Sequence, residues 1–311
     1  MADRTAAFPD RLARAVERRG TAAVVGIDPV LERLPAELRA SADTPPTAAE
    51  ALERFAAGVI EAVADIVPAV KINIAFFEVY HEHGLAAYRR TIRRAQQAGL
   101  LVIADIKRGD IGSTARLYAR AHLAAEPGDN EPAVPDAVTL AGYLGAGAVA
   151  PFVELAREAG RGLYVLVRPS DPGADEVHEF GGDQRFYQKM AELVDRWGAA
   201  PELIGECGLS CVGAVVAAKD AASTRALRNR MPHTPWLVPG YGAQGATAAD
   251  CQACFLPQAG SAVVNASRSV IYAFEQADLA AAERAAWMRA IADAARHFAA
   301  DISTLGAVRH E

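Results

Sequence analysis

The chain has 311 residues, of which 51% are hydrophobic, and its charged residues give a net charge of −6. This apolar fraction supplies a large core and excludes a mainly disordered chain. The acidic balance, without a basic run, argues against nucleic acid or an anionic membrane as a partner. Because no apolar stretch reaches about 18 residues and residues 1–19 contain no apolar signal core, we expect a cytoplasmic protein without a membrane span.

Short apolar runs rich in β-branched residues alternate with alanine-rich helical patterns along the sequence. The expected strands are, in chain order, Ala22–Ile27, Ala69–Ile74, Leu100–Ile106, Ala137–Leu140, Leu163–Val167, Glu202–Glu206, Trp236–Val238 and Ala262–Asn265. The expected helices are Ala48–Ile66, Leu85–Ala98, Ser113–Ala124, Val149–Glu158, Arg185–Trp197, Val212–Ala222 and Leu279–Ala300. Strands that alternate with helices pair in parallel, so eight such units favour an α/β fold of the (β/α)8 TIM-barrel type. The alternative is a doubly wound open sheet.

The length alone would allow two domains, but α/β barrels commonly reach about 250 residues or more as one domain. We therefore expect residues 1–311 to form a single barrel domain, with insertions near residues 29–47 and 126–136. A third long segment, Ser170–Asp183, follows the fifth strand, at the face where barrel enzymes place their sites. It is a candidate lid, or else an ordinary mobile surface loop.

Lysine is rare in this chain, with four lysines against 28 arginines. A lysine therefore marks a position where a group that can lose its proton is useful. Lys107 lies at the end of the third expected strand, two residues after Asp105, and Asp110 follows in the turn. Because strand side chains alternate, Asp105 and Lys107 are predicted to share the inward face at the mouth of the barrel. The alternative is an ordinary salt bridge.

A second lysine, Lys71, interrupts the apolar second strand and shares one face with Asn73. A charged lysine in such a strand is costly unless it is paired. If this strand lies beside the one that carries Asp105 and Lys107, an array of alternating lysines and aspartates becomes possible. Such an array keeps buried lysines charged, and at a barrel mouth it is a candidate catalytic centre.

Other strands also end in polar residues. Asp28 ends the first strand, where an acid either contacts a ligand or caps a turn, and Ser170 follows the fifth. The seventh strand runs into residues 239–245, Pro-Gly-Tyr-Gly-Ala-Gln-Gly, and the eighth into residues 265–268, Asn-Ala-Ser-Arg. Loops after strands seven and eight of such barrels commonly bind phosphate, which an arginine can hold at two points.

The four cysteines form a C-x3-C and a C-x2-C pair at Cys207, Cys211, Cys251 and Cys254. We interpret them as reduced cytosolic thiols that pack as small apolar groups. The alternative is a four-thiolate zinc site, although the neighbouring segments lack zinc-ribbon turn chemistry.

The segment Asp105-x-Lys107-x-x-Asp110-Ile-x-x-Thr114 closely resembles the signature of the orotidine 5′-phosphate decarboxylase family, specifically its longer bacterial subfamily (type 2). Asp28, Lys71, residues 170–173, residues 240–245 and residues 267–268 follow the order of that family as well. The resemblance implies a (β/α)8 barrel, a homodimer, and no cofactor or metal. It also implies conversion of orotidine 5′-monophosphate to UMP, the last step of de novo pyrimidine biosynthesis.

The resemblance further implies a role for each residue of the signature. Lys107 resembles the lysine that protonates C6 of the pyrimidine as carbon dioxide leaves, and Asp105 resembles the acid placed against the substrate carboxylate. Lys71 resembles the lysine that links the ribose to the charged groups. Asp110 and Thr114 resemble residues that reach the partner's site across the dimer interface.

Substrate contacts are implied in the same way. Asp28 resembles a ribose-hydroxyl ligand, and Ser170 resembles a contact to the amide edge of the pyrimidine. Gln244 and Arg268 resemble the phosphate grip. The remaining substrate-binding residues that we expect are Asn73, Pro172 and Ser267.

The physical chemistry fits this reaction, because loss of carbon dioxide leaves a carbanion that a fixed ammonium group stabilises and then protonates. Three alternatives remain open from the residues. They are a magnesium-assisted keto-sugar-phosphate decarboxylase, a Schiff-base aldolase, and a non-catalytic phosphosugar-binding barrel.

Overall fold

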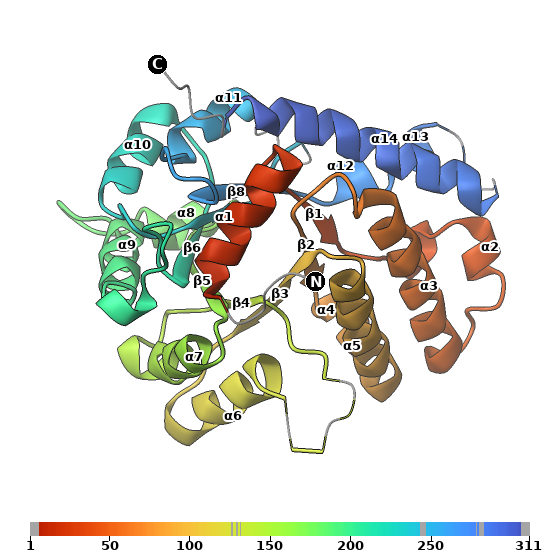
Figure 1. Cartoon of the computed structure of the whole chain (residues 1–311), viewed down its shortest axis with the longest axis horizontal. Helices are drawn as coiled ribbons and strands as arrows, with labels where there is room; N and C mark the ends of the chain where they lie inside the picture. The colour runs from red at the N-terminus through yellow and green to blue at the C-terminus, as the bar shows by residue number, and fades with distance from the viewer. Residues whose placement is uncertain are drawn as a thin grey trace.

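The computed structural model of the chain describes residues 6–125, 127, 128, 130, 132–242, 247–277, 279 and 283–305. Its strands form one closed parallel barrel in the order of the sequence, and β8 pairs with β1 to complete the circle (Figure 1). The strands are β1 Ala23–Ile27, β2 Ala69–Asn73, β3 Leu101–Arg108, β4 Ala137–Leu140, β5 Gly162–Arg168, β6 Val212–Val216, β7 Trp236–Val238 and β8 Ala262–Ala266. This closure confirms the predicted (β/α)8 barrel and excludes the doubly wound sheet.

Helices surround the barrel (Figure 1). The longer ones are α1 Phe8–Arg19, α3 Pro45–Val63, α5 His81–Gln97, α6 Gly112–Leu123, α7 Ala146–Glu158, α9 Phe186–Trp197, α10 Ala221–Asn229 and α14 Arg284–Ser303. The short ones are α2 Ala36–Arg39, α4 Ala75–Glu78, α8 Ala174–His178, α11 Ala248–Cys251, α12 Arg268–Ile271, α13 Ala273–Gln276, and the 3-10 turns Leu31–Arg33, Pro201–Leu203 and Gln252–Cys254. None of the helices in the described ranges is long and apolar enough to cross a membrane.

The N-terminal helix α1, which the sequence pattern did not predict, covers the N-terminal end of the barrel. Phe8 contacts the ring of Tyr164 on β5 edge to face, and a Cβ at Gly162 would lie only 2.1 Å from Phe8. The buried pair of Arg11 and Asp136 ties α1 to the residue just before β4. With this end covered, the opposite end carries the cavity described below.

The predicted sixth strand was wrong. Residues 202–206 belong to a 3-10 turn and the segment after it, whereas β6 is Val212–Val216, where we expected a helix. Every residue of β6 is buried, and a Cβ at Gly213 would lie 2.7 Å from the carbonyl oxygen of Pro235. Small and β-branched residues fit such a crowded strand, and their run into alanines imitates a helical pattern.

The segment near residues 29–47 is structured. It contains the turn Leu31–Arg33, helix α2 and the start of α3, where the Thr44 side chain accepts a hydrogen bond from the backbone N–H of Thr47. A threonine cap followed by Pro45 in the first turn is a strong signal for a helix start. The candidate lid, Ser170–Asp183, carries the short helix α8. The segment 126–136 lies partly outside the described residues.

Candidate active site

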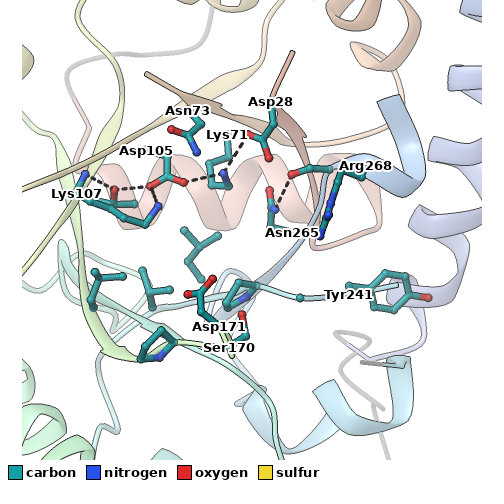
Figure 2. A pocket seen from close by; sticks show the side chains of 18 residues that line it. Asp28, Lys71, Asn73, Asp105, Lys107, Ser170, Asp171, Tyr241, Asn265 and Arg268 are labelled. Atoms are coloured by element: carbon teal, nitrogen blue, oxygen red, sulfur yellow. Dashed lines mark hydrogen bonds and ion pairs between the residues drawn. The ribbon is translucent and has the colours of Figure 1, made fainter. Parts of the chain in front are cut away.

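A cavity of about 250 Å³ opens at the C-terminal end of the barrel strands (Figure 2). Ligand sites of TIM barrels lie at this end. Predicted site residues that line it are Asp28, Lys71, Asn73, Asp105, Lys107, Ser170, Ser267 and Arg268. They come from β2 and β3, from the residues that follow β1 and β8, and from the loop after β5, so the closed barrel gathers residues that lie up to 240 positions apart in the sequence.

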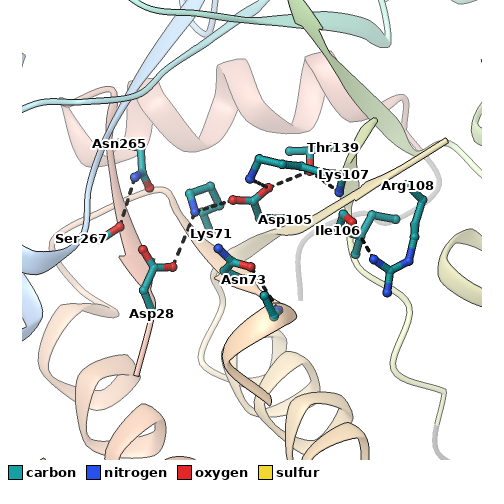
Figure 3. Close-up of polar contacts among 11 residues, drawn as sticks. Asp28, Lys71, Asn73, Asp105, Ile106, Lys107, Arg108, Thr139, Asn265 and Ser267 are labelled. Carbon is teal, nitrogen blue, oxygen red and sulfur yellow. Dashed lines mark hydrogen bonds and ion pairs between the residues drawn. The ribbon is translucent and has the colours of Figure 1, made fainter. Parts of the chain in front are cut away.

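Four of these side chains form what we call the charged array: Asp28, Lys71, Asp105 and Lys107 (Figure 3). Lys71 Nζ lies 2.9 Å from Asp105 Oδ2 and 3.7 Å from Asp28 Oδ1. Lys107 Nζ donates to Asp105 Oδ1 over 2.6 Å. Thr139 Oγ1, on β4, also donates to Asp105 Oδ1, over 2.8 Å. Acids and bases therefore alternate along one wall of the cavity.

The array fixes the charge of its buried members. Burial alone would lower the pKa of Lys71, but the charges of Asp28 and Asp105 outweigh it and raise that pKa above its ordinary value. Burial would likewise raise the pKa of Asp105, but the charges of Lys71 and Lys107 hold it well below its usual range. An ionised Asp105 thus sits between two ammonium groups at neutral pH.

The position of Lys107 depends on an irregularity in β3. Pairing between β3 and β4 shifts between Ala104 and Arg108, and Lys107 has a left-handed backbone with φ of 44°. This conformation is unfavourable for a residue other than glycine and is found mostly where a site requires it. The Lys107 N–H donates to Thr139 Oγ1 over 3.0 Å. Asp105 and Lys107 both line the cavity, as the alternation predicted, and this irregularity of β3 sets the backbone from which Lys107 meets Asp105.

Some predicted site residues do not line this cavity. Asp110 is half-buried in the turn, where its Oδ1 accepts a hydrogen bond from the N–H of Ile111, and Thr114 is exposed on α6. Pro172 lies in the candidate lid without lining the cavity. Gln244 falls outside the described residues.

The segment after β5 is anchored beneath the candidate lid by Arg168, whose side chain is buried. Its guanidinium donates to Ser223 Oγ over 3.0 Å and to Glu179 Oε1 over 2.9 Å. It also lies 4.4 Å from the ring centroid of Tyr187. Because Glu179 directly follows α8, this ion pair holds the C-terminal end of the short helix against the end of β5.

Sequence reasoning missed several cavity residues. Thr139 lies in a strand of ordinary composition, where threonine is common, so nothing marked it. Asn265 did carry a signal, because an amide at an inward position of an apolar strand is costly without a partner. The lining residues Leu166, Pro169, Val215 and Leu237 were not predicted either, whereas Pro239, Gly240 and Tyr241 belong to the predicted phosphate loop and Asp171 to the quoted segment 170–173.

The cysteines lie away from this cavity. All four are unpaired, three are buried, and burial raises the pKa of Cys211 and of Cys251 to about 11. A thiol with such a raised pKa is a poor metal ligand. Across the described ranges, no three His, Cys, Asp or Glu side chains are placed to hold one metal ion.

Comparison with known proteins agrees with this geometry. Residues 37–285 match the model of the family described as orotidine 5′-phosphate decarboxylase / HUMPS. The chain is 39% identical to orotidine 5′-phosphate decarboxylase of Rhodopirellula baltica, covering 91% of this chain and 95% of the relative. The enzyme of Clostridium perfringens is 33% identical, covering 86% and 89%.

Solved structures agree as well. A structure from Streptomyces avermitilis assigned to the same enzyme superposes with a TM-score of 0.75 at 36% identity, covering 97% of this chain and 96% of that one. The OMP decarboxylase of Leishmania donovani gives a TM-score of 0.72 at 27% identity, covering 96% and 99%. This chain therefore belongs to the orotidine 5′-phosphate decarboxylase / HUMPS family.

Proposed function

We propose that this protein converts orotidine 5′-monophosphate to UMP and carbon dioxide, the last step of de novo pyrimidine biosynthesis. Its family and its relatives support the reaction. The observation that carries the proposal is the charged array, with Lys107 Nζ 2.6 Å from Asp105 at the cavity. A decarboxylase needs such a preorganised cation where negative charge develops.

The order of residues around the cavity suggests how the nucleotide lies. Arg268 and Ser267 follow β8 and offer donors for the phosphate. Asp28 follows β1 and accepts from ribose hydroxyls. The pyrimidine then reaches Lys107 at β3, with Ser170 available to its amide edge. Binding the phosphate far from the reacting carbon holds the ring in place for the chemical step.

The reaction breaks one carbon–carbon bond and forms one carbon–hydrogen bond. The electron pair of the C6–carboxylate bond stays on C6 as carbon dioxide leaves. The Lys107 ammonium stabilises this developing charge and transfers a proton to C6, leaving a neutral amine. Because the Lys107 side chain is 49% exposed without substrate, water can return the proton between turnovers. Asp105 and Lys71 hold the ammonium in place.

We also propose that two copies of the chain associate through an apolar surface beside the mouth. Ile111, Leu117 and Tyr143 are exposed by 65%, 62% and 78%. Ile111 directly precedes α6, Leu117 lies on it, and Tyr143 lies between β4 and α7, the helix that packs against α6. Exposed apolar patches of this kind support association. The same surface carries the segment with Asp110 and Thr114, which would then face the partner's cavity.

Cytoplasmic location is part of this proposal. Four unpaired cysteines, three of them buried, suit a reducing compartment, and the substrate is a soluble nucleotide.

The decarboxylase assignment predicts that purified protein consumes orotidylate without added metal or cofactor. Orotidylate loss is followed by ultraviolet absorbance, with and without a chelator. We expect equal rates in both samples, because the ammonium group supplies the electrostatic stabilisation. A rate abolished by the chelator would instead indicate the magnesium-assisted reaction, and no loss of orotidylate in either sample would refute the proposed function.

The dimer proposal predicts complementation between two inactive variants. Lys107→Ala destroys its own site but still supplies Asp110, whereas Asp110→Ala keeps Lys107. In an equimolar mixture half of the dimers combine both chains, and each such dimer has one intact site of two. After mixing and exchange we expect about a quarter of the wild-type activity. Activity no higher than the sum of the separate variants, from a mixture shown to exchange subunits, would contradict a shared site.

A further inference from the structure

Asn265 has a buried side-chain amide at the cavity, and only one of its two polar ends makes a hydrogen bond (Figure 2). It lies on β8, lines the cavity and is 7% exposed. Its Nδ2 donates to Ser267 Oγ over 3.3 Å, whereas its Oδ1 is buried without a hydrogen-bond partner. Buried polar atoms in folded proteins are nearly always paired, so a buried acceptor at a cavity wall points to a ligand donor.

A second acceptor without a hydrogen bond lies just after the neighbouring strand. Asp28 Oδ1 is also buried without a hydrogen-bond partner, and its distance of 3.7 Å from Lys71 Nζ is too long for a hydrogen bond. β1 and β8 are adjacent in the barrel, and Figure 3 shows Asp28, Asn265 and Ser267 along the same side of Lys71. Asn265 Oδ1 and Asp28 Oδ1 are thus two acceptors without a hydrogen-bond donor on the same wall of the cavity.

The backbone leaves room for these acceptors. Gly26 lies on β1, and a Cβ there would fall 1.9 Å from Ser267 Oγ and 3.1 Å from Asn265 Oδ1. Any larger residue at position 26 would therefore displace Ser267 and crowd the amide. Because Ser267 holds the Nδ2 end of Asn265, the Oδ1 end keeps its orientation.

The position of Asn265 in the barrel indicates which part of a bound nucleotide would lie beside it. Around the barrel, Arg268 follows β8, Asp28 follows β1, and Lys107 lies on β3 beyond β2. A nucleotide whose phosphate is at Arg268 and whose pyrimidine is at Lys107 places its ribose between them. The ribose offers two hydroxyl donors, which suits two unpaired acceptors.

We propose that Asn265 is a specificity-determining residue whose Oδ1 accepts a hydrogen bond from a ribose hydroxyl, so that with Asp28 it selects ribonucleotides over deoxyribonucleotides. The inference rests on the proposed function. A site that hydrogen-bonds a substrate hydroxyl discriminates strongly against the analogue that lacks it, because its buried acceptor is then left unpaired.

The test measures kcat/KM for orotidylate and for its 2′-deoxy and 3′-deoxy analogues. Asn265→Leu keeps the side-chain size but removes the acceptor. We expect it to lower kcat/KM for orotidylate by about tenfold or more and to change the value for one deoxy analogue by less than about threefold. Asn265→Asp keeps an acceptor at the same place, so the ratio between the ribo and deoxy substrates should stay near that of the wild type.

Asn73→Ala is the matched control. Asn73 lines the same cavity, but its Oδ1 already accepts a hydrogen bond from the N–H of Ala75 over 3.1 Å. Its loss should therefore affect all three substrates by a similar factor.

If Asn265→Leu keeps the wild-type ratios of kcat/KM between orotidylate and both deoxy analogues, the inference is overturned. The decarboxylase assignment would remain intact. Equal ratios in Asn265→Leu and Asn265→Asp would overturn the inference as well, since Asn265→Asp keeps the acceptor that Asn265→Leu lacks. If Asn265→Leu fails to fold, Asn265→Ala, which also lacks the acceptor, takes its place with the same expected and contradicting results. Equal kcat/KM values of the wild type for orotidylate and both deoxy analogues would also overturn the inference, because no hydrogen bond to a ribose hydroxyl would then contribute. No turnover of orotidylate by the wild type would instead refute the proposed function.

Discussion

Replacement of Lys107 by alanine is expected to lower kcat for orotidylate by about 10⁴-fold or more, because in the proposed mechanism one side chain both stabilises the carbanion and donates the proton. The arginine-rich composition sharpens this expectation. An arginine could supply the charge but barely releases a proton, so Lys107→Arg should also be severely impaired. Turnover is measured by loss of orotidylate absorbance, and UMP binding is measured by calorimetry.

UMP binding distinguishes a chemical role of Lys107 from a structural one. Lys107→Ala should bind UMP within about tenfold of the wild type, because the residues proposed to contact the phosphate and the ribose lie elsewhere in the cavity. Lys189→Ala is the matched control, since Lys189 is half exposed on α9 and its nearest acid, Glu192, is 3.8 Å away. It should retain wild-type kcat. Turnover by Lys107→Ala within tenfold of the wild type would refute the assignment.

Lys71→Met is expected to destabilise the fold by about 3 kcal/mol and to reduce activity strongly. Removing one member of a buried ionic network leaves its partners uncompensated, which typically costs about 3–5 kcal/mol. Here Lys107 and Thr139 still contact Asp105, so we expect the lower end of that range. The free energy of unfolding is measured in urea. A second substitution, Asp28→Asn, should recover part of the loss by removing the other uncompensated charge.

The same variant makes a prediction about pH. The pKa of Lys71 is raised by folding, so its stabilising contribution is present below the ordinary lysine pKa and is lost as pH rises through the folded value. The pKa of Asp105 is lowered, so its contribution is present above the ordinary aspartate pKa and is lost as pH falls. The stability difference between wild type and Lys71→Met should therefore be constant between about pH 5 and 9 and shrink outside that window. A difference that changes steadily across neutral pH, or a variant as stable as the wild type, would contradict the account.

Part of the site followed from the sequence because the barrel obeys simple periodicity. Lys71 and Asn73 share an inward face by strand alternation, and parallel pairing places Asp105 beside Asn73 in the register. Closure of the barrel brings the ends of β8 and β1 next to them. These relations need only the strand positions and the parallel order.

Other features depend on contacts that no local pattern contains. Strand alternation predicted that Asp105 and Lys107 share a face, but it did not predict the register irregularity of β3 or the left-handed backbone of Lys107. Thr139 forms hydrogen bonds with both Lys107 and Asp105, but in the sequence nothing distinguishes it from other threonines in strands. The strand at residues 212–216 was mistaken for a helix because the crowding that requires Gly213 comes from Pro235 and Tyr164, which lie far away in the sequence. Each of these features is set by tertiary contacts and not by the local sequence.

Restoring an ammonium group at position 107 by chemistry tests the central claim most directly. Lys107→Cys is treated with bromoethylamine, which converts the thiol into a side chain that ends in an ammonium group at nearly the length of lysine. Lys107→Ala treated in the same way controls for reaction at the native cysteines. We predict that orotidylate turnover by Lys107→Cys is almost absent before treatment and rises at least about 10²-fold after it, with no rise in the control. Equal turnover before and after treatment would contradict the account.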